Sequence, residues 1–299
     1  MIKKEIYIEI LFNDFCNLYG DVGNIMYFEK SKKYLEDNYN IGLNIIYTGL
    51  NDEISFIKRD DISFVYMGSF SEKYRNKIIS KLKENKKEIF EKIRNGQNML
   101  VTGNAFDIFG KYIILDRRYE NHNYITCKEN IKTLNYYNIE KIEDIKIKEE
   151  DISKIDKKYI IDTLGLYGTV AVEEMLLRHN TFTLAKYEDI KLIGFKNTFT
   201  QSFELKRSNS EKNDSKYFAK VIRGSGISDE NPYEGIKINN FLSTYLLGPI
   251  LINNPFFTKK LFKKIFEVEN IFLEEELIKL YNTRLYEFED EERNLGKFR

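Results

Sequence analysis

The sequence has few of the residues that build metal sites and disulfides. Among 299 residues it contains no tryptophan, three prolines, two histidines and two cysteines. Cys16 and Cys127 are too few for a disulfide framework at this length, so we expect free thiols in a reducing cytoplasm. Two histidines and two scattered cysteines also give no metal-ligand spacing, and no metal is predicted.

The chain also lacks the signals of membranes, nucleotides and nucleic acids. No apolar run approaches the roughly 18 residues that a spanning helix needs. The first residues run into a short strand-like stretch and not into a cleavable apolar region, so no signal peptide is predicted. Lys plus Arg and Asp plus Glu number 47 each, which gives no cationic surplus for nucleic acid. No phosphate-binding glycine motif is present, so no cofactor is predicted.

What is present is the pattern of a globular α/β protein. Apolar residues make up 42% and charged residues 31%, enough for a substantial core. Short apolar runs alternate with amphipathic stretches, and this alternation predicts a mainly parallel sheet with helices on both faces. The predicted strands are residues 5–12, 43–47, 62–67 and 99–102, with further short β-like runs in 161–203. The predicted helices are residues 24–38, 72–94, 257–268 and 272–290.

The domain organisation follows from composition. Residues 119–158 are charged, rich in Tyr and Asn, and weakly periodic, so we interpret them as an insertion on the domain edge. No clean linker appears elsewhere. We therefore predict one domain over residues 1–256, followed by a helical extension over 257–299.

Two long motifs carry a family resemblance. Residues 11–25, L-F-N-D-F-C-N-L-Y-G-D-V-G-N-I, resemble L-Y-P-D-L-L-N-L-Y-G-D-R-G-N-I. Residues 243–255, S-T-Y-L-L-G-P-I-L-I-N-N-P, resemble G-T-Y-L-H-G-P-L-L-P-K-N-P. Both motifs are similar to those of class I glutamine amidotransferases of the cobyric acid synthase (CobB/CobQ) type, in particular the glutaminase-type (GatD-like) subunit of lipid II isoglutaminyl synthase.

Shorter motifs extend the resemblance along the chain. Residues 162–166 resemble the family's P-G-L-G-L turn, residues 193–198 its V-G-F-E-N-H segment, and residues 224–226 with 234–235 its G-x-G-N-N and E-G pair. The family's G-G-G-Q-D turn, whose backbone N–H groups stabilise an oxyanion, corresponds to Gly68, Ser69 and Phe70. The resemblance implies that Gly68 and Arg178 bind substrate, Arg178 through the glutamine carboxylate.

The resemblance also exposes two losses. The family's nucleophile segment C-G-G-Y-Q-L-L-G aligns with residues 103–110, which places Gly103 at the cysteine's position. Leu247 occupies the position of the family's catalytic histidine. Hydrolysis of glutamine by this route needs a thiolate and an adjacent base, and neither replacement supplies one.

Three functions are therefore open. The favoured hypothesis is a catalytically degenerate homologue that acts as a binding or regulatory subunit, paired with a Mur-ligase-like protein that amidates a peptidoglycan precursor. The alternative is an active glutaminase subunit that supplies ammonia for that amidation with relocated catalytic residues. A third possibility is a sensor that binds a small amino acid in the remodelled pocket.

Other polar residues have simpler interpretations. Asn104 and Asp107 are interpreted as groups that satisfy the backbone at a helix start, in preference to ligand binding. His179 is interpreted as a surface or strand histidine rather than a base. A hidden dyad of His122 and Cys127 is disfavoured, because no orienting partner is evident near them.

Overall fold

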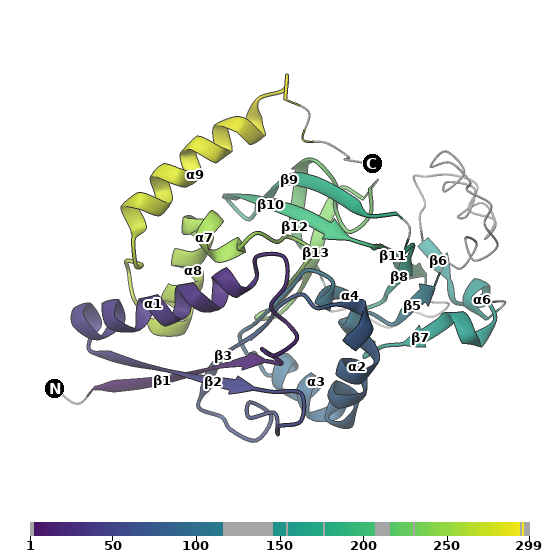
Figure 1. The fold of residues 1–299 in the computed structure, drawn as a ribbon, viewed down its shortest axis with the longest axis horizontal. Coiled ribbons are helices and arrows are strands. Elements are labelled where there is room, and N and C mark those ends of the chain that lie inside the picture. Colours follow the sequence, from purple (N-terminus) through teal and green to yellow (C-terminus); the bar gives the residue numbers. More distant parts are fainter. Residues whose placement is uncertain are drawn as a thin grey trace.

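The fold was described from a computed structural model, which describes residues 3–115, 146–153, 155–175, 177–206, 216–229, 231–293 and 295. The chain builds two β-sheets and two groups of helices (Figure 1). In chain order the elements are β1 (Lys4–Leu11), α1 (Val22–Tyr39), β2 (Ile41–Thr48), β3 (Ile62–Met67), η1 (Glu72–Tyr74), α2 (Arg75–Glu84), α3 (Lys86–Arg94), β4 (Met99–Thr102), α4 (Ala105–Phe109), β5 (Tyr112–Leu115), β6 (Lys146–Lys148), α6 (Glu149–Ile152), η5 (Lys157–Tyr159), β7 (Ile160–Asp162), β8 (Thr169–Glu173), β9 (His179–Tyr187), β10 (Ile190–Thr198), β11 (Thr200–Lys206), β12 (Lys216–Arg223), β13 (Tyr233–Ile238), β14 (Phe241–Thr244), α7 (Ile250–Asn253), α8 (Pro255–Phe266) and α9 (Glu274–Glu289).

The larger sheet is half parallel and half antiparallel. Its strand order is β10-β9-β12-β13-β14-β4-β3-β1-β2. The neighbours from β14 to β2 pair in parallel, as the sequence predicts. The neighbours from β10 to β14 pair antiparallel. A two-residue turn at Glu188 and Asp189 joins β9 to β10, and so short a connection cannot cross over to a parallel partner.

A smaller sheet has the order β6-β11-β8-β5-β7 and lies beside the antiparallel half of the larger one (Figure 1). Of the β-like runs in residues 161–203, β7, β8 and β11 join this sheet, while β9 and β10 join the larger one. Most of the predicted insertion, residues 119–145 and 154, lies outside the described residues. The division into a domain and a C-terminal extension stays a prediction.

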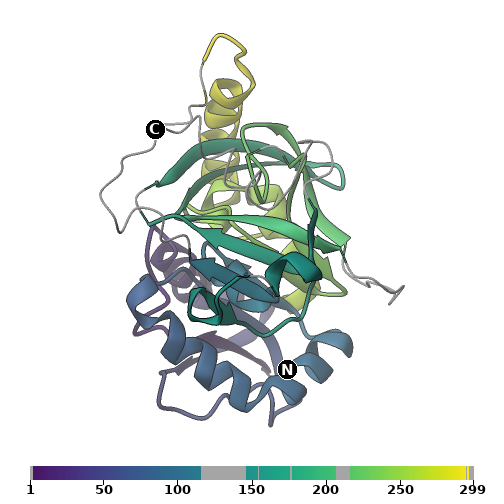
Figure 2. The same cartoon turned by 90° about the vertical axis from the view of Figure 1, so that its right-hand side faces the viewer.

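Helices cover both faces of the parallel strands, which confirms that part of the predicted fold. Side chains alternate along β3, so Phe64 and Tyr66 pack toward α1 and α8. Val65 and Met67 point to the other face and pack toward α2 and α3. In Figures 1 and 2 the C-terminal helix α9 lies on the far side of the antiparallel strands from α2 and α3.

One helix differs from its prediction. The stretch 72–94 has continuous helical periodicity, yet it is divided into η1, α2 and α3. The break falls at Asn85, whose backbone leaves the helical region at φ −120° and whose side-chain amide donates to the Lys81 carbonyl. Asn side chains compete with helical hydrogen bonds in this way, and the apolar pattern alone does not reveal it.

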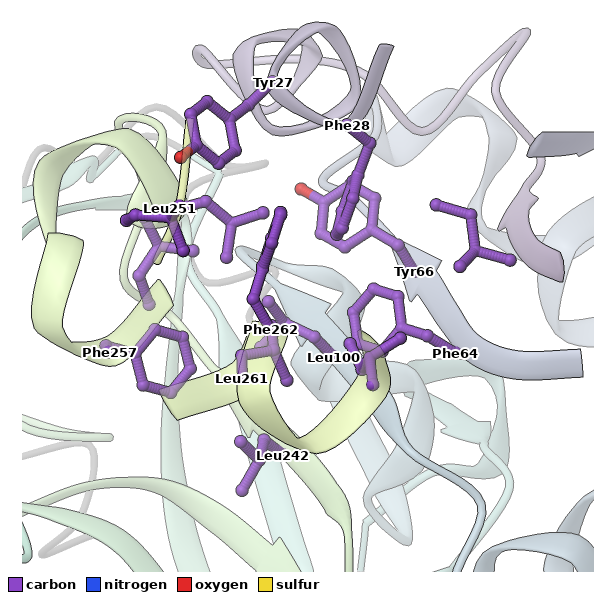
Figure 3. Close-up of a cluster of buried hydrophobic side chains, with 14 of the residues drawn as sticks. Tyr27, Phe28, Phe64, Tyr66, Leu100, Leu242, Leu251, Phe257, Leu261 and Phe262 are labelled. Carbon is purple, nitrogen blue, oxygen red and sulfur yellow. The ribbon is translucent and has the colours of Figure 1, made fainter. Parts of the chain in front are cut away.

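The two C-terminal helices form as predicted. Phe262 of α8 stacks on Phe28 of α1, with ring centroids 5.7 Å apart and planes 4° from parallel. Both rings are fully buried, and Phe64 of β3 lies beneath them (Figure 3). None of the described helices is long and apolar enough to cross a membrane.

We predict that Phe262→Ala lowers the free energy of unfolding by about 3–5 kcal/mol, because it leaves a cavity among close-packed rings. Urea denaturation measures the change. Tyr286→Ala, at a side chain that is 73% exposed, is the control and should shift the free energy by less than about 0.5 kcal/mol. Equal effects of the two variants would contradict the packing described.

Candidate functional site

Gly103 lies at the carboxyl end of β4, in the turn that leads into α4. Its φ of +63° falls in the left-handed region, which glycine adopts without steric cost. A Cβ placed on this residue would lie 2.6 Å from Ser69 Cβ and 2.9 Å from Leu247 Cδ2. The structure therefore brings the nucleophile position, the oxyanion turn and the base position of the resemblance to one point. Two neighbouring side chains fill the space that a thiol would need.

Leu247 is held at this point by strand pairing. Its N–H donates to the Phe195 carbonyl at 3.0 Å, and the Phe195 N–H donates back at 3.3 Å. Asn254 extends the contact, because its amide bonds both the N–H and the carbonyl of Ile193. Leu247 is 1% exposed, so its apolar side chain lies wholly inside the protein.

The turn after β3 is tied down by Asp21, from the first long motif. The Ser69 N–H donates to Asp21 Oδ2 at 2.7 Å, and the Ser69 hydroxyl donates to the same oxygen at 2.8 Å. Thr102, at the end of β4, donates to it as well, at 2.9 Å. Burial raises the pKa of Asp21 to about 6, since the hydrogen bonds it accepts offset only part of the lost hydration.

The next N–H of this turn is also engaged. Phe70 N–H donates to Asn104 Oδ1 at 3.0 Å, and Asn104 Nδ2 donates to the Phe70 carbonyl at 2.7 Å. The interpretation of Asn104 as a side-chain helix cap is wrong, because its side chain makes no cap hydrogen bond. The amide is turned toward the neighbouring loop, where it satisfies two backbone groups at once.

Gly68, a predicted substrate-binding residue, has a packing role in this turn. A Cβ on it would lie 2.6 Å from the Cys16 carbonyl oxygen and 3.1 Å from Asp21 Cβ. Only glycine lets the turn approach the first motif so closely. Cys16 itself is completely buried, and that burial raises the pKa of its thiol well above the usual range.

The remaining motifs pack around the same centre. Asn24 of the first motif donates to Tyr66 Oη at 2.8 Å and accepts from Leu251 N–H at 3.0 Å, joining α1, β3 and α7. A Cβ on Gly23 would lie 2.7 Å from Pro249 Cγ, so the first and last long motifs touch. Leu164 N–H donates to the Ile108 carbonyl at 2.9 Å, which places the 162–166 turn against α4.

Asp107 forms a second buried carboxylate site, on α4. It accepts hydrogen bonds from the hydroxyls of Tyr245, Thr200 at 2.7 Å and Ser202 at 3.3 Å. Its side chain does not cap the helix, so that interpretation is also wrong. Burial is the main reason that the pKa of Asp107 rises to about 6.

A buried lysine lies over the ring of Tyr245, one of the hydroxyl donors to Asp107. Lys196 is completely buried, donates to the Gly226 carbonyl at 2.9 Å and lies 4.7 Å above the Tyr245 ring. Glu234 accepts from the Tyr245 N–H at 2.7 Å. Burial raises the pKa of Glu234, while the Lys196 charge opposes the rise. The short motifs of the resemblance thus hold one another through buried polar contacts, which their spacing does not disclose.

Arg178 and His179 stand at the start of β9. Arg178 is exposed, and its guanidinium lies 4.4 Å from the centre of the Phe199 ring and 5.8 Å from that of Tyr19 in the first motif. Its role as a substrate ligand stays a prediction. His179 is a buried strand residue, 3.6 Å from Glu174 and 4.0 Å from Asp229. His122 and Cys127 lie outside the described residues, and within those residues no cluster of acidic, His or Cys side chains fits a metal ion.

Comparison with known proteins finds a distant relative of the chain. No protein-family model matches the chain. It is 26% identical over 268 residues to "Lipid II isoglutaminyl synthase (glutamine-hydrolyzing) subunit GatD" of Staphylococcus aureus, which covers 89% of this chain and 87% of that protein. Among solved structures, PurLQS from Thermotoga maritima aligns with 89% of this chain and 97% of its own at TM-score 0.43 and 10% identity. A glutamine amidotransferase from the same organism aligns with 94% and 91% at TM-score 0.40 and 10% identity.

The chain is glutamine amidotransferase-like. More particularly, it is a distant homologue of the GatD subunit, and this assignment rests on the sequence relationship over nearly the whole chain. At such TM-scores the superpositions on solved structures are loose and add nothing to it.

We predict that Gly103→Ala lowers the free energy of unfolding by about 2–4 kcal/mol, from the left-handed backbone together with the overlap on Ser69. Gly165→Ala is the matched control, because φ there is +69° but the nearest atom to a new Cβ is 4.0 Å away. Gly165→Ala should lower the free energy of unfolding by about 1–2 kcal/mol, because it introduces the backbone strain without the overlap. In a protein that already carries Ser69→Gly, Gly103→Ala should lower the free energy of unfolding by about 1 kcal/mol less, or by an even smaller amount. If the effects of the two substitutions simply add, the overlap between position 103 and Ser69 is refuted.

Asp107 gives a pH-dependent prediction. Its folded-state pKa of about 6 lies above the unfolded value of about 3.9, so the folded state binds the proton more tightly. Stability from this group is therefore greatest below about pH 4 and decreases as pH rises through about 6, by roughly 3 kcal/mol in all. Asp107→Asn removes the titration. The wild type should therefore lose stability between pH 4 and pH 7.5 while Asp107→Asn does not. The free energy of unfolding of the variant minus that of the wild type should increase by about the same amount over this range.

Thermal or urea unfolding across that pH range measures the difference. Asp37→Asn, at an exposed position of α1, provides the control for effects of net charge. If the wild type and Asp107→Asn differ by the same amount at every pH, the carboxylate is not held as described.

Proposed function

We propose that this chain is a catalytically degenerate glutamine amidotransferase-like protein that acts as a binding or regulatory subunit. The observation that carries the proposal is the packing at Gly103, where Ser69 and Leu247 occupy the place of a nucleophilic side chain. Glutamine hydrolysis by a class I site needs a thiolate that forms a covalent glutamyl intermediate. Glycine supplies no such group, and leucine at position 247 supplies no base.

The state of the oxyanion turn supports the same proposal. A tetrahedral intermediate is stabilised by backbone N–H groups that point at the developing negative charge. In this chain the N–H of Ser69 donates to Asp21, and the N–H of Phe70 donates to Asn104. Both donors are already satisfied by side chains of the protein, so neither is free to receive an oxyanion.

The alternative is an active glutaminase with relocated residues, in keeping with the relative's name as a glutamine-hydrolysing subunit. Cys16 is close to the oxyanion turn, but its thiol is buried and its pKa is raised, which keeps it protonated and unreactive. This alternative therefore receives less support from the geometry than the degenerate subunit.

The proposed partner follows from the same relationship. Because the chain is a homologue of one subunit of lipid II isoglutaminyl synthase, we propose that it binds a Mur-ligase-like amidating protein. Because such a ligase consumes ATP, we propose that the complex works in the cytoplasm. Purification of the tagged chain from its native cell should recover a Mur-ligase-like companion. Recovery of an unrelated protein would count against the pairing.

The catalytic part of the proposal is tested by a glutaminase assay on the purified chain and on the co-purified complex. We expect no glutamine turnover above the uncatalysed rate, since loss of nucleophile and base removes several orders of magnitude. Cys16→Ala and Cys127→Ala serve as the matched variants. Turnover that either variant abolishes would establish the active glutaminase instead.

A further inference from the structure

A cavity of about 420 Å³ lies between the β9–β10 edge of the large sheet, α9 and the residues that follow α9. Its apolar wall includes Phe182, Phe195, Phe288 and Leu247. Figure 1 shows α9 passing above these strands, and α9 contacts β9 and β10 directly. The volume falls in the range of sites that enclose a small organic molecule.

The C-terminal wall of the cavity is fixed by hydrogen bonds. Arg223 of β12 donates to the carbonyls of Phe288 at 2.6 Å, Asp290 at 2.7 Å and Arg293 at 2.7 Å. Phe182 N–H donates to the Leu295 carbonyl at 3.1 Å, which ties Leu295 to β9. These contacts hold the wall in place around an empty volume, as a preformed binding site requires.

Of the two arginines at the rim of the cavity, one is paired with carboxylates and the other is not, in the part of the chain that the structure describes. Arg293 forms ion pairs with Glu287 at 3.0 Å and Asp290 at 3.4 Å. Arg284 bonds the side-chain oxygen of Asn253, a neutral acceptor, and among the described residues it has no carboxylate partner within ion-pair distance. Among the charged side chains that line the cavity, Arg293 and Glu287 pair with each other, so Arg284 is the one whose charge no described carboxylate offsets.

We propose that this cavity binds a small amphipathic carboxylate. The apolar body of the ligand packs against the three phenylalanine rings, and its carboxylate pairs with the guanidinium of Arg284. Arginine suits this role because its planar fork matches a carboxylate in bidentate geometry. This cavity is a separate site beside the Gly103 turn. It rests on the proposed function, a binding or regulatory subunit, and names the chemical class of the ligand.

The position of the cavity links it to the degenerate centre. Leu247 lines the cavity and also places Cδ2 2.9 Å from the point where a Gly103 side chain would begin. Leu247 is 1% exposed, so its side chain lies between the cavity and the Gly103 turn and separates them. The two sites share this one side chain.

The test compares two probes on the wild-type protein by isothermal titration calorimetry: 4-phenylbutyrate, and the neutral 4-phenylbutyramide of the same shape. We expect the carboxylate to bind at least about tenfold more tightly, since a charge-assisted pair is stronger than a neutral hydrogen bond. Equal affinities, or no binding of either probe at millimolar concentration, would overturn the proposal without recourse to any variant.

Variants locate the site. Arg284→Gln removes the charge but keeps a side-chain donor for Asn253, so it should abolish the preference for the carboxylate. Lys279→Gln removes an exposed cation from the same helix, outside the cavity lining, and should leave the preference unchanged. A preference that persists in Arg284→Gln would place the carboxylate elsewhere and refute the assignment.

Discussion

The contact of the Gly103 turn with Ser69 and Leu247 is the constraint on which the rest of the site depends. Three segments distant in sequence meet there because β3, β4 and β14 are adjacent parallel strands that end at the same edge of the sheet. Catalytic sites in α/β proteins form at such an edge. In this chain the edge is closed by a hydroxymethyl group and an isobutyl group, and glycine is what allows them to approach.

Two buried polar systems support this closure from either side. Asp21 and Asn104 fix the turn after β3, while Asp107, with Thr200, Ser202 and Tyr245, joins α4 to β11 of the smaller sheet and to the residue that follows β14. Buried polar groups are costly unless they are paired, so these contacts specify one arrangement of the loops. Asp21 and Asn104 also occupy the backbone N–H groups of Ser69 and Phe70, which stand at the oxyanion turn of the family resemblance.

The sequence predicted the fold better than the contacts around the candidate site. Strands β3 and β4 end where their apolar runs end, because a buried parallel strand is apolar on both faces. The motif alignment singled out Gly103 and Leu247, and the structure brings these two residues close together. It could not show that Asn104 bonds Phe70, since the partner is 34 residues away and no local pattern records the pairing. The break at Asn85 and the antiparallel half of the sheet were missed for a similar reason: each depends on single residues or short turns, not on periodicity.

The central claim is that no nucleophile is presented at this strand edge. Intact-mass spectrometry after incubation with a diazoketone analogue of glutamine tests it most directly, because such a reagent alkylates an active-site nucleophile with loss of nitrogen. The account predicts an unmodified protein, alone and with its co-purified partner, under conditions that label an active glutaminase completely. A stoichiometric adduct that maps to Cys16, Cys127 or any residue beside Gly103 would contradict it.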